Sequence, residues 1–264
     1  MADQLILFEH PLSPYAQKVK ISLREKDIPF KLEQPAALGT GELADDFAAA
    51  NPRGEVPVLF DGDVTLFDSK VILDYIEDKW PTPALMPTDP VHRAKVRTLQ
   101  EVMDTQYEAI NWGLGEVEFF KRGAGTCADT LRARAADQVA KLHGWLTKQL
   151  GNNTWFNGEE FGFGDLAVIP YINGSAGFGL RPEPGSPLAA WHANVTERPA
   201  VERTSLEAAA SISSMEQVGE FVDQGLFKRE YRDHRLEWMM RSGGVEVVTD
   251  GLAKDNIRFS NEIA

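Results

Sequence analysis

The chain has 264 residues, of which 43% are hydrophobic and 25% are charged, and its formal net charge is −13. This composition is ordinary for a globular protein with a sizeable core, and the acidic balance argues against nucleic acid as a partner. Cys127 is the single cysteine, so an internal disulfide is excluded. The sequence has neither an apolar run of membrane-spanning length nor a signal-peptide pattern. We therefore expect a cytoplasmic protein that does not bind membranes.

The first 80 residues alternate between strand patterns and helix patterns, with the order βαβ and then ββα. The expected elements are a strand at Leu5–Phe8, a helix from Tyr15 to about Asp27, a strand at Phe30–Glu33, a loop with a short helix in Ala36–Ala50, a hairpin in Val56–Phe67 and a helix in Ser69–Trp80. Prolines between Pro81 and Pro90 then predict a domain boundary. Residues 1–80 are thus predicted to form a small α/β domain.

Residues 91–210 have a helical pattern almost throughout, which predicts an all-helical second domain. Breaks are expected in Lys121–Asp129, Gly151–Asp165 and Leu180–Pro187. Residues 211–264 form a further segment, expected to be a largely helical C-terminal extension. Within it, a helix is predicted from about Gly225 to Gly243, because large apolar residues such as Trp238 would pack it on the body of the protein.

Three local motifs carry chemical information. Ser13 and Tyr15 place two hydroxyl groups where the first helix begins, in the stretch SPYAQKV. The stretch NPRGEVP ends in Val56-Pro57, just before the hairpin, and Asp68-Ser69 opens the next helix. Each motif has a purely structural interpretation, because hydroxyl and carboxylate side chains cap helices and proline often starts a strand. Free N–H groups at a helix start also bind anions, including thiolates.

Together these motifs resemble those of the glutathione S-transferases, over roughly residues 5–210. The resemblance implies a thioredoxin-like α/β domain, then an all-α domain, with the C-terminal extension outside the family pattern. It implies glutathione as co-substrate, with no metal and no nucleotide cofactor. Val56 and Pro57, joined by a cis peptide bond, would pair with the glutathione backbone. Asp68 would hold its ammonium group and Ser69 its carboxylate.

The same resemblance implies that a hydroxyl group activates the glutathione thiol. A thiol has an ordinary pKa near 8.5, so an enzyme must favour the thiolate by a hydrogen bond or a helix dipole. The start SPYAQKV is similar to that of omega-class members, which carry cysteine where this chain has Ser13. With serine there, thiolate activation as in theta-like bacterial members is expected in place of a mixed disulfide. Ser13 is the first candidate for the thiol-contacting group and Tyr15 is the rival.

The predicted activity is transfer of glutathione to an electrophilic, mostly apolar small molecule, as in detoxification. The second-substrate pocket is expected between the domains, with four candidate lining residues: Leu12, Tyr107, Asn111 and Trp112. Tyr107 and Trp112 could equally belong to the helix core. Two alternative functions remain open, which are glutathione-dependent ether cleavage or dehalogenation, and a non-enzymatic binding or regulatory role. We expect a homodimer, the commonest oligomer.

Other reactive residues receive structural interpretations. Asp165, in FGFGDLAVIPYI, is expected to cap a buried helix whose cap position is Gly162. His10 is expected to be packed and hydrogen-bonded, and Cys127 matches no family motif. No spacing of histidines and carboxylates indicates a metal site, and no glycine-rich loop follows a strand as nucleotide binding would need.

Overall fold

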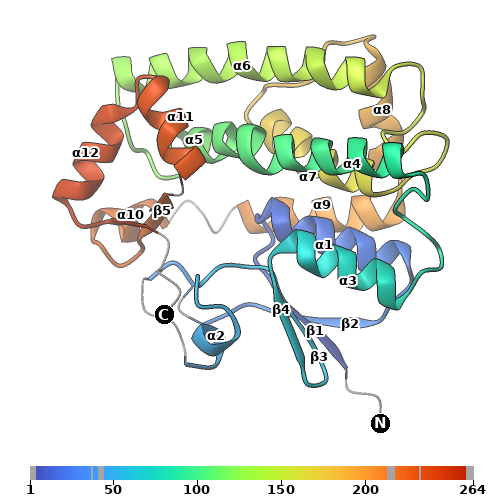
Figure 1. Ribbon diagram of the computed structural model, residues 1–264. Helices are drawn as coiled ribbons and strands as arrows, with labels where there is room; N and C mark the ends of the chain where they lie inside the picture. Colours follow the sequence, from blue (N-terminus) through green and yellow to red (C-terminus); the bar gives the residue numbers. More distant parts are fainter. Residues whose placement is uncertain (1–3, 37, 41–44, 213–217, 232, 260–264) are drawn as a thin grey trace.

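The computed structural model describes residues 4–36, 38–40, 45–212, 218–231 and 233–259. A four-stranded sheet and its helices form the N-terminal part, helices form the central part, and a C-terminal extension lies against one end of the central helices (Figure 1). The thioredoxin-like domain and the all-α domain follow in the predicted order, and the additional helices lie beyond them.

The N-terminal sheet has the strand order β2-β1-β3-β4. Its elements are β1 (Leu5–Phe8), α1 (Pro14–Glu25), β2 (Phe30–Glu33), α2 (Asp45–Ala50), β3 (Val58–Asp61), β4 (Val64–Phe67) and α3 (Ser69–Lys79). Strand β1 is parallel to β2 and antiparallel to β3, which is antiparallel to β4. Helix α1 begins at a serine cap followed by proline, the preferred N-terminal pair.

The predicted site residues lie near one end of the strands of this sheet, and we call this end the sheet edge. Phe8 pairs with both Glu33 and Val58, and Val58 pairs with Phe67. Strands β1, β2 and β4 therefore end at this edge, and β3 begins there. Ser13 follows β1, Gly39 follows β2 and Asp68 follows β4, while Val56-Pro57 precedes β3. All four positions therefore lie on the same side of the domain.

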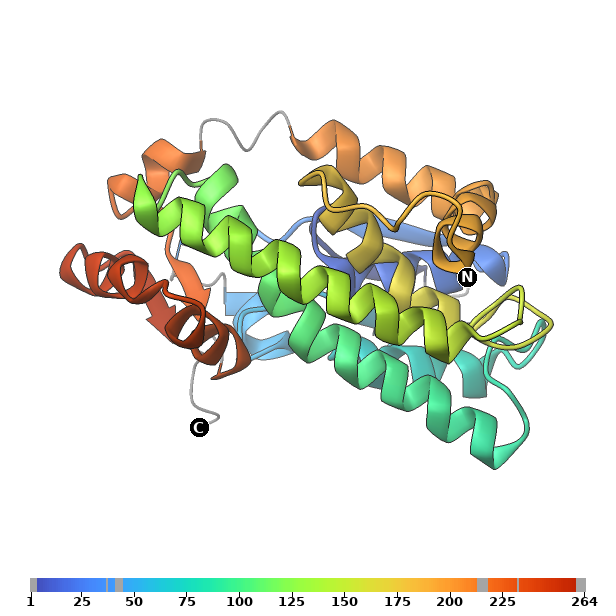
Figure 2. The same cartoon turned by 90° about the horizontal axis from the view of Figure 1, so that it is seen from above.

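The helical domain is built around long helices with a shared apolar core (Figure 2). Its elements are α4 (Pro90–Val102), a π-helical segment η1 (Met103–Tyr107), α5 (Glu108–Glu118), α6 (Thr126–Leu150), α7 (Phe163–Gly177), α8 (Pro187–Thr196) and α9 (Pro199–Ile212). Helix α7 is almost entirely buried, as expected for a helix that is apolar all round. The π-helical segment joins α4 to α5 and has no signal in the sequence pattern.

The C-terminal extension contains α10 (Val218–Asp223), β5 (Arg229–Tyr231), α11 (Asp233–Arg241), α12 (Val245–Ala253) and β6 (Ile257–Phe259). It wraps around the end of α5 and α6, with α10 on one side and α11 and α12 on the other (Figure 2). The single helix predicted from Gly225 to Gly243 is wrong over its first half. Residues 229–231 instead pair as a parallel strand with residues 257–259, a partner too distant in sequence for helical periodicity to reveal.

Candidate functional site

Ser13 is the N-cap of α1. Its side-chain oxygen accepts a hydrogen bond of 3.3 Å from the main-chain N–H of Ala16, and the side chain is only half-buried. The structural interpretation of Ser13 is thus confirmed, but capping uses the oxygen as an acceptor. A serine hydroxyl also has a proton to donate. Ser13 can therefore cap the helix and donate to an anion at the same time.

Tyr15 points toward the helical domain. Its hydroxyl donates a 2.8 Å hydrogen bond to the main-chain oxygen of Asp104 in η1, and its ring meets that of Tyr171 edge-on. The hydroxyl is thus engaged at the contact between the two domains. Tyr15 thus uses its hydroxyl proton in a contact within the protein, whereas the Ser13 oxygen acts as an acceptor in its cap.

The stretch NPRGEVP forms a compact turn before β3. The Asn51 amide donates to the main-chain oxygen of Glu55 over 2.7 Å, and its side-chain oxygen accepts from the N–H of Arg53 over 3.0 Å. Gly54 has φ +67°, a conformation that favours glycine. This turn presents Val56-Pro57, whose peptide bond is cis as the resemblance implied.

The peptide edge of Val56 is placed for strand-like pairing with a ligand. The ladder of β3 begins only at Val58. Among the described residues, no hydrogen bond engages the main-chain N–H or oxygen of Val56. An extended peptide lying along this edge would satisfy both groups.

Asp68 is the N-cap of α3, and its carboxylate accepts from the N–H of Lys70 over 3.0 Å. Its φ of +75° lies in the left-handed region, which is strained for a residue with a Cβ atom and recurs at functional sites. Arg53 lies 3.3 Å from the same carboxylate. Ser69 begins the helix beside it and is buried. The sequence motif does not predict a role for Arg53, because any residue type can stand at this position of the family pattern.

A buried ion pair connects the site helices to the helical domain. Lys18 of α1 lies 2.5 Å from Asp104 of η1, and both side chains are almost inaccessible to solvent. The hydroxyl of Tyr171 donates to the same carboxylate oxygen over 2.6 Å. Burial lowers the pKa of Lys18, while the nearby Asp104 carboxylate opposes this effect. Together with Tyr15, the pair fixes the start of α1 against the second domain.

The predicted second-substrate residues have different surroundings. Tyr107 is fully buried, and its hydroxyl contacts His143 at 2.8 Å and Ser175 at 2.9 Å, so it belongs to the helical core. The Asn111 amide donates to the main-chain oxygen of Tyr171 between α5 and α7. These two side chains thus make their hydrogen bonds within the helical domain.

Trp112 of α5 lies instead against the C-terminal extension. The guanidinium groups of Arg229 and Arg235 lie 4.7 and 5.2 Å from its ring centre. Leu12 is half-buried in the loop before Ser13. Of the four predicted lining residues, Leu12 is the one that directly precedes Ser13 in the sequence.

Two reactive residues, Asp165 and His10, take the structural roles expected of them. Asp165 accepts from the N–H groups of Phe156 and Gly162 and from the indole of Trp191, at 2.9, 3.0 and 2.7 Å. Burial raises its pKa to about 6. His10 accepts from the N–H of Leu12 over 3.3 Å, and burial lowers its pKa.

Cys127 begins α6, where its thiol lies 3.9 Å from the main-chain oxygen of Gly243. Burial raises the pKa of this thiol, with Glu246 adding to the effect. A raised pKa disfavours the reactive thiolate.

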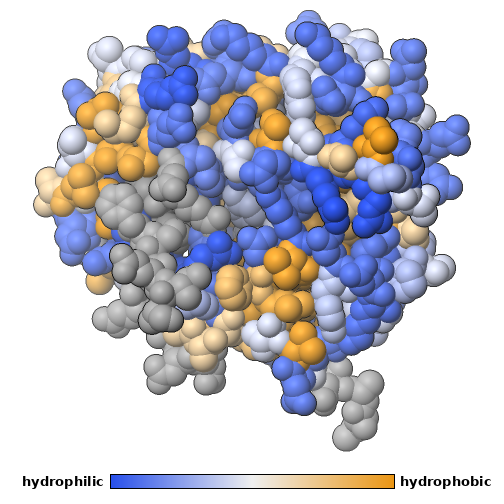
Figure 3. All heavy atoms as spheres, in the orientation of Figure 1, coloured by the Kyte–Doolittle hydropathy of each residue, from blue (hydrophilic) through white to orange (hydrophobic). Residues whose placement is uncertain are grey.

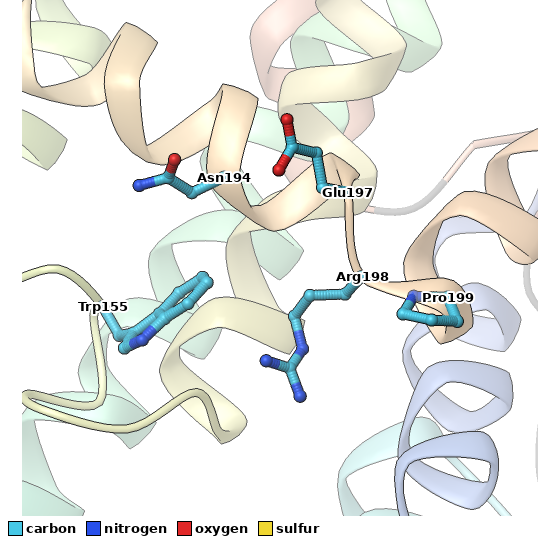
Figure 4. Close-up of a pocket in the computed structure, with 5 residues that line it drawn as sticks. All are labelled: Trp155, Asn194, Glu197, Arg198 and Pro199. Carbon is cyan, nitrogen blue, oxygen red and sulfur yellow. The ribbon is translucent and has the colours of Figure 1, made fainter.

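A hollow of about 420 Å³ lies between α8, the start of α9 and the loop after α6 (Figure 4). Its lining residues are Trp155, Asn194, Glu197, Arg198 and Pro199. Arg198 is held by Glu25 at 2.9 and 2.5 Å and lies over the ring of Phe161. Because its cation is already engaged in packing the two domains together, we assign no ligand to this hollow.

Every helix in the described part of the chain is too short or too polar to span a membrane. No group of three or more histidine, cysteine or carboxylate side chains among those residues is arranged to hold a metal ion.

Comparisons with known proteins cover both domains. Residues 7–84 match the family model of the glutathione S-transferase N-terminal domain, and residues 94–199 match that of the C-terminal domain. The chain is 30% identical to glutathione S-transferase GstB of Escherichia coli K12 over 200 residues, which are 72% of this chain and 92% of that protein.

A name other than a transferase also occurs among the relatives. The chain is 35% identical to a stringent starvation protein A homolog of Haemophilus ducreyi over 106 residues, which are 40% of this chain and about half (48%) of that protein. Among solved structures, a glutathione S-transferase from Rhodospirillum rubrum F11 superposes with a TM-score of 0.67 at 25% identity. That match covers 76% of this chain and 91% of the other.

Proposed function

Because this chain belongs to the glutathione S-transferase family, we propose that it binds glutathione at the sheet edge and activates its thiol for attack on an electrophilic, mostly apolar small molecule. The observation that carries the proposal is the position of Ser13, Val56-Pro57 and Asp68 at one edge of the sheet. These groups are complementary to the thiol, the peptide and the charged end of one extended tripeptide.

The division of labour follows from the chemistry of each group. Ser13 donates to the thiolate, and the N-terminus of α1 adds a favourable dipole. Val56 pairs with the glutathione main chain through its own N–H and carbonyl oxygen. Asp68 holds the ammonium, and the free N–H groups at the start of α3, with Ser69, hold the adjacent carboxylate. Arg53 keeps the Asp68 carboxylate oriented, because it lies 3.3 Å from it.

Isothermal titration calorimetry with glutathione tests the binding step, and a panel of electrophiles assayed with glutathione tests the chemistry. We expect micromolar to millimolar binding and thiol consumption with at least one electrophile. Absence of glutathione binding would overturn the proposal.

A non-enzymatic binding or regulatory function is the second candidate, because not every relative is named a transferase and a stringent starvation protein A homolog is among them. Glutathione binding without turnover of any electrophile in the panel would favour it. Ether cleavage and dehalogenation use the same thiolate and differ in the leaving group, so electrophiles of both kinds belong in the panel.

We further propose a homodimer. Apolar residues gather on the surface over β4 and the beginning of α3 (Figure 3), and Val64 and Val71 in these elements are 39% and 50% exposed. Exposed apolar side chains that lie together indicate a protein contact. A second copy of the same chain would cover this face symmetrically.

A further inference from the structure

A turn of residues 10–13 joins β1 to α1 and ends at the proposed thiol-contacting residue. The main-chain N–H of Ser13 donates to the oxygen of His10 over 2.8 Å, and this hydrogen bond closes the turn. Pro11 occupies the second position of the turn, where proline is preferred. Ser13 is at the same time the N-cap of α1. The direction in which Ser13 presents its hydroxyl group therefore depends on the geometry of this turn.

Both ends of the turn are anchored. Before it, the N–H of Glu9 donates to the main-chain oxygen of Glu33 over 2.8 Å. The buried carboxylate of Glu9 also lies 3.0 Å from the fully buried Lys20 of α1. After the turn, the N–H of Gln17 donates to the oxygen of Ser13 over 3.0 Å. In a turn with fixed ends the central peptide can still reorient, since turn types I and II differ mainly in the direction of this peptide.

The central peptide of the turn, between Pro11 and Leu12, is held on both sides by side chains. The amide of Gln17 donates from Nε2 to the oxygen of Pro11 over 2.8 Å. On the other side, the N–H of Leu12 donates to Nδ1 of His10 over 3.3 Å. Burial lowers the pKa of His10, so Nδ1 keeps its lone pair at neutral pH. One peptide unit thus has both of its polar groups engaged, which opposes its rotation.

Gln17 is an unusual residue for this position, because glutamine is mostly exposed in proteins and Gln17 is buried. Ordering its long side chain costs conformational entropy. Helix α1 does not need it as a cap, since Ser13 already accepts from the N–H of Ala16. The contact that Gln17 makes is with the turn.

We propose that Gln17 is a positioning residue for thiolate activation, which holds the Pro11 carbonyl group and thereby fixes the direction in which Ser13 donates to the glutathione sulfur. This inference rests on the proposed function. Gln17 acts through Ser13, so its loss weakens stabilisation of the thiolate. The contacts of Val56 and Asp68 with the rest of glutathione are unaffected.

Gln17→Met tests the inference, because methionine is a long, flexible side chain that donates no hydrogen bond. The thiol pKa of bound glutathione, followed by thiolate absorbance, should rise by about 0.5 to 1, and kcat should fall roughly three- to tenfold, the effect of one neutral hydrogen bond. KM for glutathione should stay within about twofold. A side chain that only stabilises the fold would change neither the thiol pKa nor kcat of the folded protein.

The double variant shows whether Gln17 acts through Ser13. In the Ser13→Ala protein, Gln17→Met should change neither the thiol pKa nor kcat further, because the donor that Gln17 positions is already absent. Additive effects of the two substitutions would overturn the inference.

Arg24→Met is the matched control. Arg24 lies on the same helix and is also largely buried, but its guanidinium contacts α9, through Thr204 at 2.6 Å and Glu207 at 2.5 Å. Its loss should lower the unfolding free energy and leave the thiol pKa unchanged. An equal rise of the thiol pKa in Arg24→Met would show a general effect of loosening α1 and would overturn the specific role of Gln17.

His10 provides a test from the other side of the same peptide. His10→Asn keeps an acceptor for the N–H two residues further on, as in an Asx turn, and should retain the thiol pKa. His10→Leu removes the acceptor and should raise the thiol pKa. If Gln17→Met does not fold cooperatively, this pair decides, and equal thiol pKa values in the two His10 variants would then overturn the inference.

Failure of the inference and failure of the proposed function give different results. An unchanged thiol pKa in folded Gln17→Met, together with a raised one in Ser13→Ala, would overturn the role of Gln17 and leave the proposed function in place. An unchanged thiol pKa in Ser13→Ala, or absence of glutathione binding by the unchanged protein, would overturn both.

Discussion

The hydroxyl of Tyr15 donates a hydrogen bond to the main-chain oxygen of Asp104, 89 residues further along the chain. This bond and the Lys18–Asp104 ion pair join α1 to the π-helical segment of the second domain. The contact engages the hydroxyl proton of Tyr15, the residue that the sequence ranks below Ser13 as the thiol-contacting group. Tyr15 connects the domains, whereas Ser13 remains at the helix start with a proton to donate.

Ser13→Ala should therefore reduce turnover, and Tyr15→Phe should not. A hydrogen bond to a charged group contributes about 1.5–3 kcal/mol, so loss of the Ser13 donor should lower kcat roughly ten- to a hundredfold. The pKa of bound glutathione, followed by thiolate absorbance, should rise. Tyr15→Phe leaves a buried carbonyl oxygen without its donor and should lower the unfolding free energy by about 1–3 kcal/mol. Loss of activity in Tyr15→Phe with full activity in Ser13→Ala would reverse the assignment.

Asp68→Ala should raise KM more than it lowers kcat. Asp68 would contact the ammonium end of glutathione, far from the sulfur, so its binding energy is shared by ground state and transition state. A charged hydrogen bond worth about 1.5–3 kcal/mol corresponds to a roughly ten- to hundredfold rise in KM. Asp74→Ala is the control, because Asp74 lies on the same helix and is 53% exposed. A lower kcat at unchanged KM would contradict the assignment.

Trp238→Ala should strongly destabilise the protein. The Trp238 ring packs on Gly113 of α5, where a Cβ atom would come within 2.4 Å of it, and the indole N–H donates to Gln138 over 2.5 Å. Truncation of a buried tryptophan costs about 3–5 kcal/mol, measurable by urea denaturation. Met240→Ala, on an exposed part of the same helix, should change stability little. Deletion of all residues after Met215 should lower both the melting temperature and the solubility.

A melting temperature that does not change on this deletion would show that the extension contributes nothing to the stability of the body. An unchanged unfolding free energy for Trp238→Ala would contradict the packing of α11 on α5.

Stability should fall at acid pH partly because of His143. Burial lowers its pKa to about 4, against an ordinary value of 6.5. Between pH 6.5 and pH 4 the unfolded chain therefore binds more protons at this residue than the folded protein does. The contribution of His143 to the unfolding free energy is thus fully present above pH 6.5 and is lost as the pH falls toward 4. His143→Gln should lose less stability than the unchanged protein from pH 7 to pH 4.5, by urea denaturation.

His92→Gln is the control for that comparison, because the His92 side chain is 60% exposed. The raised pKa of Asp165 has the opposite effect on how stability depends on pH. Asp165 is present in the unchanged protein and in both variants, so the difference between their pH profiles reports His143 alone. Identical pH profiles for both variants would contradict the prediction.

The protein should behave as a dimer in solution. Light scattering should give about twice the chain mass of 29.3 kDa, and Val71→Glu should shift the mass toward the single chain by placing a charge on the exposed apolar face. A mass near one chain for the unchanged protein would refute the dimer. Val91→Glu, at a separate exposed position on α4, tests whether any surface charge has the same effect.

The sequence by itself determined the features that are satisfied within a few residues. Ser13 caps α1 and Asp165 caps α7 as the local patterns predicted, because each bonds to a group close by in the chain. Strand and helix periodicity likewise predicted both domains. The tertiary structure alone decided that Tyr107 belongs to the core and that residues 229–231 pair with 257–259. Those outcomes depend on which distant segments the fold brings into contact, and no local pattern carries that information.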